Sequence, residues 1–476
     1  MPPAHSIIAA RRMPNNEHEL SGNPAESVEP LDPALPSRFA RWQFTVLASM
    51  YVGYAAFMLC RNTLIACSAE MISDPTLQMD KEDFGRLMSW HSAGAIMGKL
   101  VTGPGADLLG GRRMFLIALS LTAIANVGFA FGSSFFLFAT FNFMGQFCKA
   151  GGWPAMTKLV GAWFPESRYG QVWSIISTSS RVGTIAAGLL FGFLLSMISW
   201  RSVFLTSAIL TAGVAIALFF TLKESPKSLG LNRESDKQPG NDANVDDEHS
   251  ADLDAIAHPL DHLRIGQACL KFAASGRFWF IGFSIIFLTI VMDFLTFIPI
   301  YLSEQLQISP SRASMAGSSF PLGMFVALIL TSFLYDRLSK SQLIWALGGL
   351  LSVSCLAVTV LWNLGLVPEA VRTPAAIVTI FLLGLTISPA YYVPMSVFSV
   401  SFGGKHSGFL VALIDVFGYS GALLFNYFGG SVAEHYGWQV FLTGLLAITL
   451  SATVCMVTFL TLDWHAHRRL KPLPTA

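Results

Sequence analysis

The sequence predicts an all-α membrane protein whose twelve transmembrane helices form two six-helix bundles. Three observations support this fold class: hydrophobic side chains make up 53% of the 476 residues, they gather in twelve apolar stretches, and a polar interval divides the stretches into two sets of six. One membrane crossing takes about 20 apolar residues, so twelve crossings take about 240. That requirement matches the apolar content of the chain and argues against a soluble globular enzyme.

Residues 1–41 are expected to form a disordered cytoplasmic tail. They contain several prolines and no apolar core, so they do not resemble a cleaved signal peptide, and their acidic residues argue against a mitochondrial presequence. The N-terminal bundle is predicted at 42–222. Its six apolar stretches lie near 43–69, 84–106, 114–131, 135–163, 170–198 and 202–222.

The interval 223–277 is predicted to be a cytoplasmic linker, largely disordered. Its acidic run around Asn241 to Asp254 cannot bury a hydrophobic core. The C-terminal bundle is predicted at 278–462 and a second cytoplasmic tail at 463–476. The six apolar stretches of this bundle lie near 278–302, 313–334, 342–362, 374–399, 408–432 and 438–461.

The distribution of basic residues predicts the orientation in the membrane. The two tails and the even-numbered loops hold 20 of the 30 lysines and arginines, the odd-numbered loops hold 4, and 6 lie inside or at the edge of helices. Because cytoplasmic loops carry an excess of basic residues, both termini are expected in the cytoplasm. The protein is accordingly expected in a bacterial inner (plasma) membrane.

Two loops carry similar clusters of charge, which suggests that the halves are repeats. Asp107, Arg112 and Arg113 follow the second predicted helix, and Asp336 and Arg337 follow the eighth. Parallel repeats of this kind are common in secondary transporters. We expect each aspartate to pair with a neighbouring arginine and to latch the cytoplasmic ends of the bundles together in an outward-facing state. The alternative is that these residues only set the topology.

Six charged residues lie well inside predicted helices, away from their ends, where a charge costs roughly 2.5–3.5 kcal/mol unless it is paired or lines a polar cavity. Four cations against two acids leave an excess of +2 that an anionic substrate would balance. The cations are Arg61, Lys99, Lys149 and Arg181, and the acids are Asp293 and Asp415.

The spacing of these charges points them into a cavity. Tyr54, Phe57 and Arg61 follow an i, i+3, i+7 pattern and therefore share one helix face. Lys99 either lines the same cavity or belongs to the loop cluster around Asp107. Since the acids lie in one bundle and the cations in the other, we expect one acid to pair with Arg181 or Lys149. The other acid would then be free to take up a proton.

Several motifs, taken together, indicate a family. The sequence resembles the organophosphate:phosphate antiporters of the major facilitator superfamily, which include the glycerol-3-phosphate and hexose-phosphate transporters. The resemblance covers both halves and rests on Gly53 to Asn62, Gly98-Lys99 with Gly103 and Asp107, Gly152-Trp153-Pro154, Pro299 with Tyr301-Leu302, Phe417-Gly418-Tyr419 and Gly437-Trp438.

The resemblance implies the major facilitator fold and a role for Arg61 in binding substrate phosphate. It also implies that Tyr54 lines the pocket and that Lys99 lies on the substrate path. Three positions depart from the family pattern. The arginine expected in the seventh helix falls at about Val291, a histidine of the fifth falls at Ser180, and a glutamine of the fourth falls at Lys149.

The function predicted from these features is secondary active transport of a small organic anion, an organophosphate or a carboxylate, by alternating access. The alternatives are a proton-coupled symporter of a sugar or sugar acid, and a transporter-like membrane ligand sensor. The partners expected are the lipid bilayer and a coupling ion, either protons or inorganic phosphate, and the protein is expected to be a monomer.

Enzymatic, metal and nucleic-acid functions are not expected. The sequence has no glycine-rich phosphate loop, and its six cysteines show no CxxC pair and no histidines at ligand spacing, so neither a metal nor another cofactor is predicted. A net charge of +1 offers no basic surface for nucleic acid.

Overall fold

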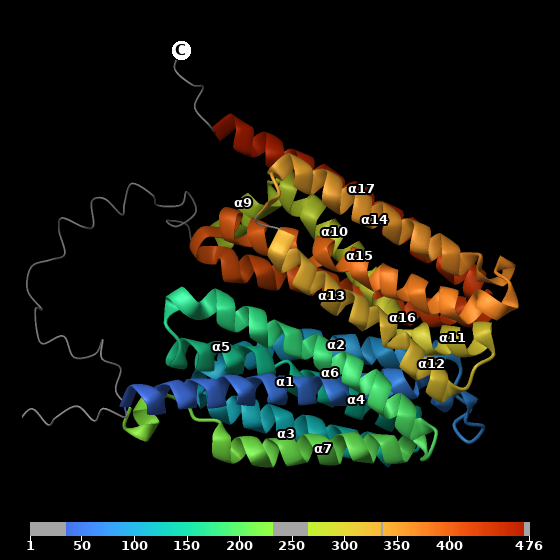
Figure 1. Ribbon diagram of the computed structural model, residues 1–476, viewed down its shortest axis with the longest axis horizontal. Coiled ribbons are helices and arrows are strands. Elements are labelled where there is room, and N and C mark those ends of the chain that lie inside the picture. Colours follow the sequence, from blue (N-terminus) through green and yellow to red (C-terminus); the bar gives the residue numbers. More distant parts are fainter. Residues whose placement is uncertain (1–34, 232–264, 335–336, 471–476) are drawn as a thin grey trace, which may run out of the picture.

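The computed structural model describes residues 35–231, 265–334 and 337–470, and nearly all of them are helical (Figure 1). The first half forms one bundle of six membrane crossings, five made by single helices and one by a broken pair. These are α1 (Leu35–Ser73), α2 (Lys81–Leu109), α3 (Gly111–Ala130), α4 (Phe135–Lys149) with α5 (Gly152–Trp163), α6 (Tyr169–Leu195) and α7 (Trp200–Thr221).

The second half forms the other bundle, which lies against the first as a separate layer in Figure 1. Two of its six crossings are broken into shorter helices. The elements are α9 (Ile265–Ala273), α10 (Gly276–Asp293), a 3-10 turn (Phe294–Thr296), α11 (Ile298–Leu306), α12 (Pro310–Gly317), α13 (Ser319–Leu334), α14 (Lys340–Trp362), α15 (Glu369–Gly403), α16 (Ser407–His435) and α17 (Gly437–Leu470).

The predicted fold class, twelve transmembrane helices in two six-helix bundles, is confirmed. Ten helical segments among the described residues are long and apolar enough to cross a membrane. The two remaining crossings are α2, which is rich in charged side chains, and the α4–α5 pair, whose helices have only 15 and 12 residues.

Two crossings that the apolar pattern predicts as continuous are broken beside a charged residue. A proline inside a helix clashes with the carbonyl group four residues earlier and removes a hydrogen bond. One crossing is broken after Lys149, and Pro154 lies in the first turn of the helix that follows. The other is broken by the 3-10 turn after Asp293, and Pro299 lies in the first turn of the next helix. The breaks leave Lys149 and Asp293 as the last residues of α4 and α10.

Helical structure extends into both regions that were expected to be tails. Residues 35–41 belong to α1, where the ring of Phe39 packs against Trp163 with centroids 6.3 Å apart. Residues 463–470 belong to α17, where Asp463 pairs with Arg277 at 3.1 Å and with Lys340 at 3.5 Å. These contacts account for the extra helical turns. The rest of the predicted tails, 1–34 and 471–476, lies outside the described residues.

The predicted linker is structured at its two edges. A 3-10 turn covers Pro226–Leu229, and α9 occupies 265–273. Helix α9 is held by Phe272, which is fully buried and lies against the rings of Phe278 and Phe402 at 6.3 and 5.8 Å. The acidic run of the linker falls within 232–264, outside the described residues.

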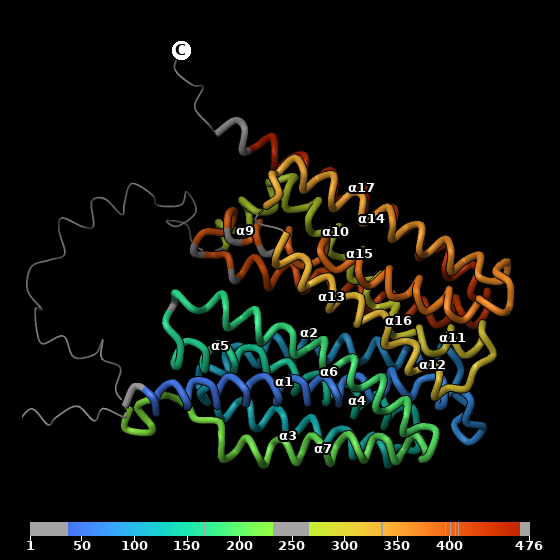
Figure 2. Tube along the Cα trace, in the orientation of Figure 1, coloured from blue at the N-terminus to red at the C-terminus, as the bar shows by residue number. Residues whose placement is uncertain are grey.

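The bundles meet most closely at the end of the molecule where α11 and α12 lie, which we call the joined end; the opposite end, where α9 lies, is the terminal end (Figure 2). There α2 packs along α16, and α6 packs against α12 and α13. A Cβ on Gly85 would overlap the carbonyl oxygen of Asn426 in the other bundle. This close backbone approach requires a glycine in α2.

Candidate functional site

The predicted intramembrane charges converge where the two bundles face each other. Lys99 of α2 crosses to the other bundle and pairs with Asp415 of α16, with Nζ and Oδ2 2.5 Å apart. Its ammonium group also lies 4.3 Å from the ring centroid of Tyr419. Lys99 therefore belongs to the interface between the bundles and not to the loop cluster around Asp107.

This pairing corrects the expectation that an acid would pair with Arg181 or Lys149. Helices α2 and α16 are packed closely because glycines such as Gly85 and Gly430 line their contact. A lysine on this face of α2 therefore reaches Asp415 directly.

Arg61 is oriented by a chain of hydrogen bonds within the N-terminal bundle. Its Nε donates to Nε2 of His91 at 3.4 Å, and Nδ1 of His91 lies 3.1 Å from Oδ1 of Asn142. The amide nitrogen of Asn142 donates to the Leu87 carbonyl at 2.9 Å. His91 consequently carries its proton on Nδ1 and stays neutral, since its Nε2 must accept from Arg61.

The terminal nitrogens of Arg61 remain free, because no described residue accepts a hydrogen bond from them. The charge of Arg61 acts on Lys149 and Lys99 in its own bundle and on Asp293 in the other. Arg61 therefore lies at the electrostatic centre of the site, with its guanidinium fork available to a ligand.

Arg181 of α6 forms a second cationic group that faces the other bundle. Its Nη1 donates to Oγ of Ser180 at 2.6 Å and to the carbonyl of Ser177 at 3.2 Å. Its guanidinium carbon lies 4.4 Å from the ring centroid of Tyr392 in α15. The Nε atom is buried and has no partner among the described residues. Such an unsatisfied buried donor is costly unless a ligand or water completes it.

Lys149 and Tyr54 complete the cationic side of the site. Lys149 stands at the C-terminal end of α4, where the helix dipole stabilises a positive charge. Tyr54 packs against Trp153 and Phe57, with ring centroids 5.6 and 6.2 Å away. Arg61 and Arg181 both act electrostatically on Tyr54, which places Tyr54 within reach of both arginines.

Asp293 stands at the end of α10, half-buried, and accepts a hydrogen bond from Nδ2 of Asn426 at 2.5 Å. No described cation lies within ion-pair distance of it. Arg61, Lys149 and Arg181 likewise have no carboxylate partner among the described residues. Three cations against one acid, with Lys99 and Asp415 neutralising each other, leave the site with the formal excess of +2 that the sequence predicted.

The predicted loop latches are not formed in this conformation between the residues that the structure describes. Asp107 pairs with Lys158 of the same bundle at 2.5 Å. Arg112 donates to the carbonyl groups of Leu222 and Phe219, at 2.6 and 2.7 Å. Arg113 and Arg337 are exposed, and Asp336 lies outside the described residues.

A second group of charges, which the sequence pattern did not reveal, joins the bundles at the joined end. Lys81 of α2 pairs with Glu304 at 3.1 Å and with Glu434 at 3.4 Å, both in the other bundle. Trp438 donates to Glu304 at 2.7 Å. Beside them, Glu82 accepts from Ser431 at 3.1 Å. Nothing in the sequence pattern pairs these loop-edge charges, since more than 200 residues separate Lys81 from either glutamate.

His91 and Asn426 were also missed as site residues. His91 is only 5% exposed, so its side chain does not reach water. The sequence feature that could have indicated this burial is the place of His91 in the apolar run between Leu87 and Lys99. Asn426 shares a helix face with Asp415 and Tyr419 in the sequence, but only the fold brings it to Asp293.

The comparisons with known proteins agree with this architecture. The Major Facilitator Superfamily model matches residues 47–304 and 278–475. A probable hexose phosphate transport protein of Chlamydia trachomatis is 27% identical over 455 residues, covering 93% of this chain and 96% of that protein. The membrane sensor protein UhpC of Salmonella typhimurium is 23% identical over 419 residues, covering 87% of this chain and 89% of the sensor.

A solved structure shows the same fold. A crystal structure of a D-xylose–proton symporter superposes with a TM-score of 0.66 at 15% identity, covering 88% of this chain and 99% of that one. At this identity the similarity concerns the arrangement of helices alone.

Proposed function

The chain belongs to the Major Facilitator Superfamily, and on that premise we propose that the small organic anion it transports carries a phosphate group. The protein is a secondary active transporter and not an enzyme. The proposal concerns the chemistry of the anion, the coupling and the orientation.

One observation carries the choice of phosphate: Arg61, Lys149 and Arg181 have no carboxylate partner among the described residues, and Asp293 is the one acid set against them. A phosphate monoester carries roughly −1.5 to −2 at pH 7, which matches an excess of +2 better than a monocarboxylate does. A guanidinium group also binds phosphate oxygens through two parallel hydrogen bonds. The similarity to a hexose phosphate transport protein supports the same class of substrate.

Within this proposal the residues have distinct roles. Arg61 and Lys149 bind the phosphate group, while Arg181 binds a second polar group of the substrate near Tyr392. Tyr54 lines the pocket between the two arginines. Lys99 does not bind substrate directly. Its ion pair with Asp415 holds the two bundles together.

Both termini are proposed to be cytoplasmic, in a bacterial inner membrane, because the basic residues concentrate in the tails and even-numbered loops. The joined end then faces outward, and the conformation described is the inward-facing one. The working unit is proposed to be a monomer, since one chain contributes both halves of the site.

Counterflow of a labelled organic phosphate in proteoliposomes tests the proposal. Arg61→Ala should lower transport roughly 100-fold, because removing one partner of a buried charged hydrogen bond costs about 2–5 kcal/mol. Arg61→Lys should lose less, since it keeps the charge but not the fork. Arg41→Ala, on the exposed start of α1, is the matched control. The proposal is contradicted if the Arg61→Ala variant shows counterflow at the wild-type rate, or if the wild-type protein prefers monocarboxylates to organic phosphates.

Asp293 favours a second candidate, in which transport is coupled to protons instead of to inorganic phosphate. Carboxylates within membrane-spanning segments of transporters commonly mark proton pathways, and Asp293 has no ion-pair partner among the described residues. In that case Asp293→Asn should abolish the response of uptake to an imposed pH gradient and preserve counterflow. If wild-type uptake ignores the gradient and responds to internal phosphate, exchange is the mechanism and Asp293 is a counter-ion.

A sensor role, suggested by the similarity to UhpC, is distinguished by the same preparation. A sensor would bind organic phosphate but show no counterflow even in the wild type. Arg61→Ala would then abolish the binding of organic phosphate.

A further inference from the structure

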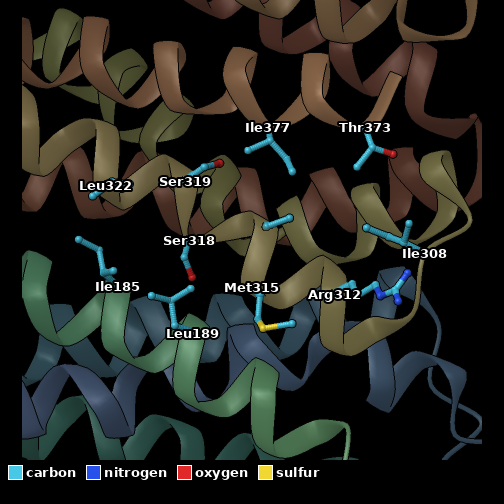
Figure 3. Close-up of a pocket in the computed structure, with 11 residues that line it drawn as sticks. Ile185, Leu189, Ile308, Arg312, Met315, Ser318, Ser319, Leu322, Thr373 and Ile377 are labelled. Atoms are coloured by element: carbon cyan, nitrogen blue, oxygen red, sulfur yellow. The ribbon is translucent and has the colours of Figure 1, made fainter. Parts of the chain in front are cut away.

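A groove of about 580 Å³ lies between the two bundles (Figure 3). Its volume lies within the roughly 300–1,000 Å³ typical of ligand sites. One wall comes from α6, through Ile185 and Leu189, and the opposite wall comes from α12, α13 and α15, through residues such as Met315 and Ile377. The groove therefore has its α6 wall only while the bundles are in contact at this place.

The position and lining of the groove indicate a hydrocarbon occupant. The segments that form its walls include three of the apolar membrane-spanning candidates, Tyr169–Leu195, Pro310–Leu334 and Glu369–Gly403. Leu189 and Leu322 in these walls are 48% and 43% exposed. Exposed leucines on membrane-spanning helices face lipid, so an acyl chain is the material available to fill the space.

One charged residue stands at the groove, and it has no partner of opposite charge. Arg312 lies in the first turn of α12, exposed, with its backbone nitrogen bound to Oγ of Ser309 at 3.4 Å. Among the residues that the structure describes, no carboxylate pairs with its guanidinium group. Cations near the ends of membrane helices extend toward the headgroup layer, where a guanidinium fork matches phosphate oxygens.

We propose that this groove binds an anionic phospholipid, with an acyl chain between the bundles and the headgroup phosphate on Arg312. The lipid occupies the leaflet at the joined end. Because its two walls belong to different bundles, the bound lipid stabilises the present conformation and leaves when the walls separate. This inference does not depend on which anion is transported.

Native mass spectrometry of protein released from nanodiscs containing equal amounts of palmitoyl-oleoyl phosphatidylglycerol and phosphatidylethanolamine tests the headgroup half of the proposal. Wild-type protein should retain phosphatidylglycerol preferentially. Arg312→Gln should reduce that preference about fivefold, the effect of one arginine near a charged lipid surface. The matched control is Arg372→Gln, because Arg372 precedes the groove residue Thr373 and already donates to the carbonyl oxygen of Val367 at 3.2 Å.

The acyl-chain half is tested by filling the groove. Ala316 lines it, so Ala316→Phe should lower the retention of both lipids while Arg312→Gln affects chiefly the anionic one. Thermal unfolding of each variant confirms that it is folded. The proposal is overturned if wild-type protein shows no headgroup preference, if Arg312→Gln keeps the wild-type ratio, or if folded Ala316→Phe retains wild-type amounts of lipid.

Discussion

The two ends of the molecule use their charges in different ways. At the joined end, Lys81 links the bundles through Glu304 and Glu434. At the terminal end, the pairs of Asp107 with Lys158 and of Asp463 with Arg277 each stay within one bundle. Ion pairs that cross the interface favour one conformation, whereas pairs inside a bundle move with it as a rigid body. The conformational equilibrium is therefore set mainly at the joined end and by the central pair of Lys99 and Asp415.

Uncharged contacts also hold the bundles together at the joined end, where glycines allow close approach of the two backbones. At the joined end, a Cβ on Gly430 would overlap the carbonyl oxygen of Lys81, just as one on Gly85 would overlap that of Asn426. Backbone against backbone cannot yield as a flexible side chain does. The difference between the ends can therefore be tested by substitution at three places, for which we expect effects of decreasing size.

The largest effect is expected from a bulky side chain in the glycine contact. Gly85→Leu should separate the bundles at the joined end and lower transport roughly 5–150-fold, since overpacking of this kind costs about 1–3 kcal/mol. Cysteines placed at the joined end should become more accessible to a membrane-impermeant maleimide. Gly213→Leu is the control, because a Cβ at Gly213 meets no atom within 4 Å. An equal loss in both variants would trace the effect to general misfolding.

A smaller shift is expected on removing the shared cation of the joined end. Lys81 is 14% exposed, against 36% for Glu304 and 33% for Glu434. Lys81→Gln leaves the two carboxylates without their cation, which should weaken the joined end by about 1–2 kcal/mol and shift the equilibrium roughly 5–30-fold toward the state in which the joined end is open. Double electron–electron resonance between spin labels on α2 and α16 measures that shift. The exposed Lys271 on α9, changed to Gln, should leave the distance distribution as it is in the wild type.

The smallest effect concerns the loop cluster of the terminal end. The side chains of Asp107 and Lys158 are 64% and 50% exposed, so their pair is worth at most about 1 kcal/mol. If Asp107 also latches the bundles in the outward-facing state, as the sequence suggested, Asp107→Asn should shift the equilibrium a few-fold toward the conformation described. Lys158→Gln removes the same pair from the other side. Identical accessibility in both variants and the wild type would mean that these residues only set topology.

The sequence alone determined the number of membrane crossings, their division into two bundles and the identity of the intramembrane charges. These features are local: hydrophobicity over about 20 residues decides whether a segment crosses the membrane, and a charge within such a segment is conspicuous wherever it points. The breaks after Lys149 and Asp293 were not predicted, although Pro154 and Pro299, which act on carbonyl groups four residues away, lie just beyond them.

The tertiary structure alone decided which charges meet. Lys99 and Asp415 are separated by 316 residues in the chain, and Lys81 and Glu304 by 223. Their pairing depends on how closely α2 approaches the other bundle. The glycine contacts between α2 and α16 set that distance. His91 illustrates the same limit, since its contact with Arg61 follows from the packing of α1 against α2 and α4. Helical periodicity gives the face on which a residue lies, but the residue across the interface is chosen by packing between distant segments.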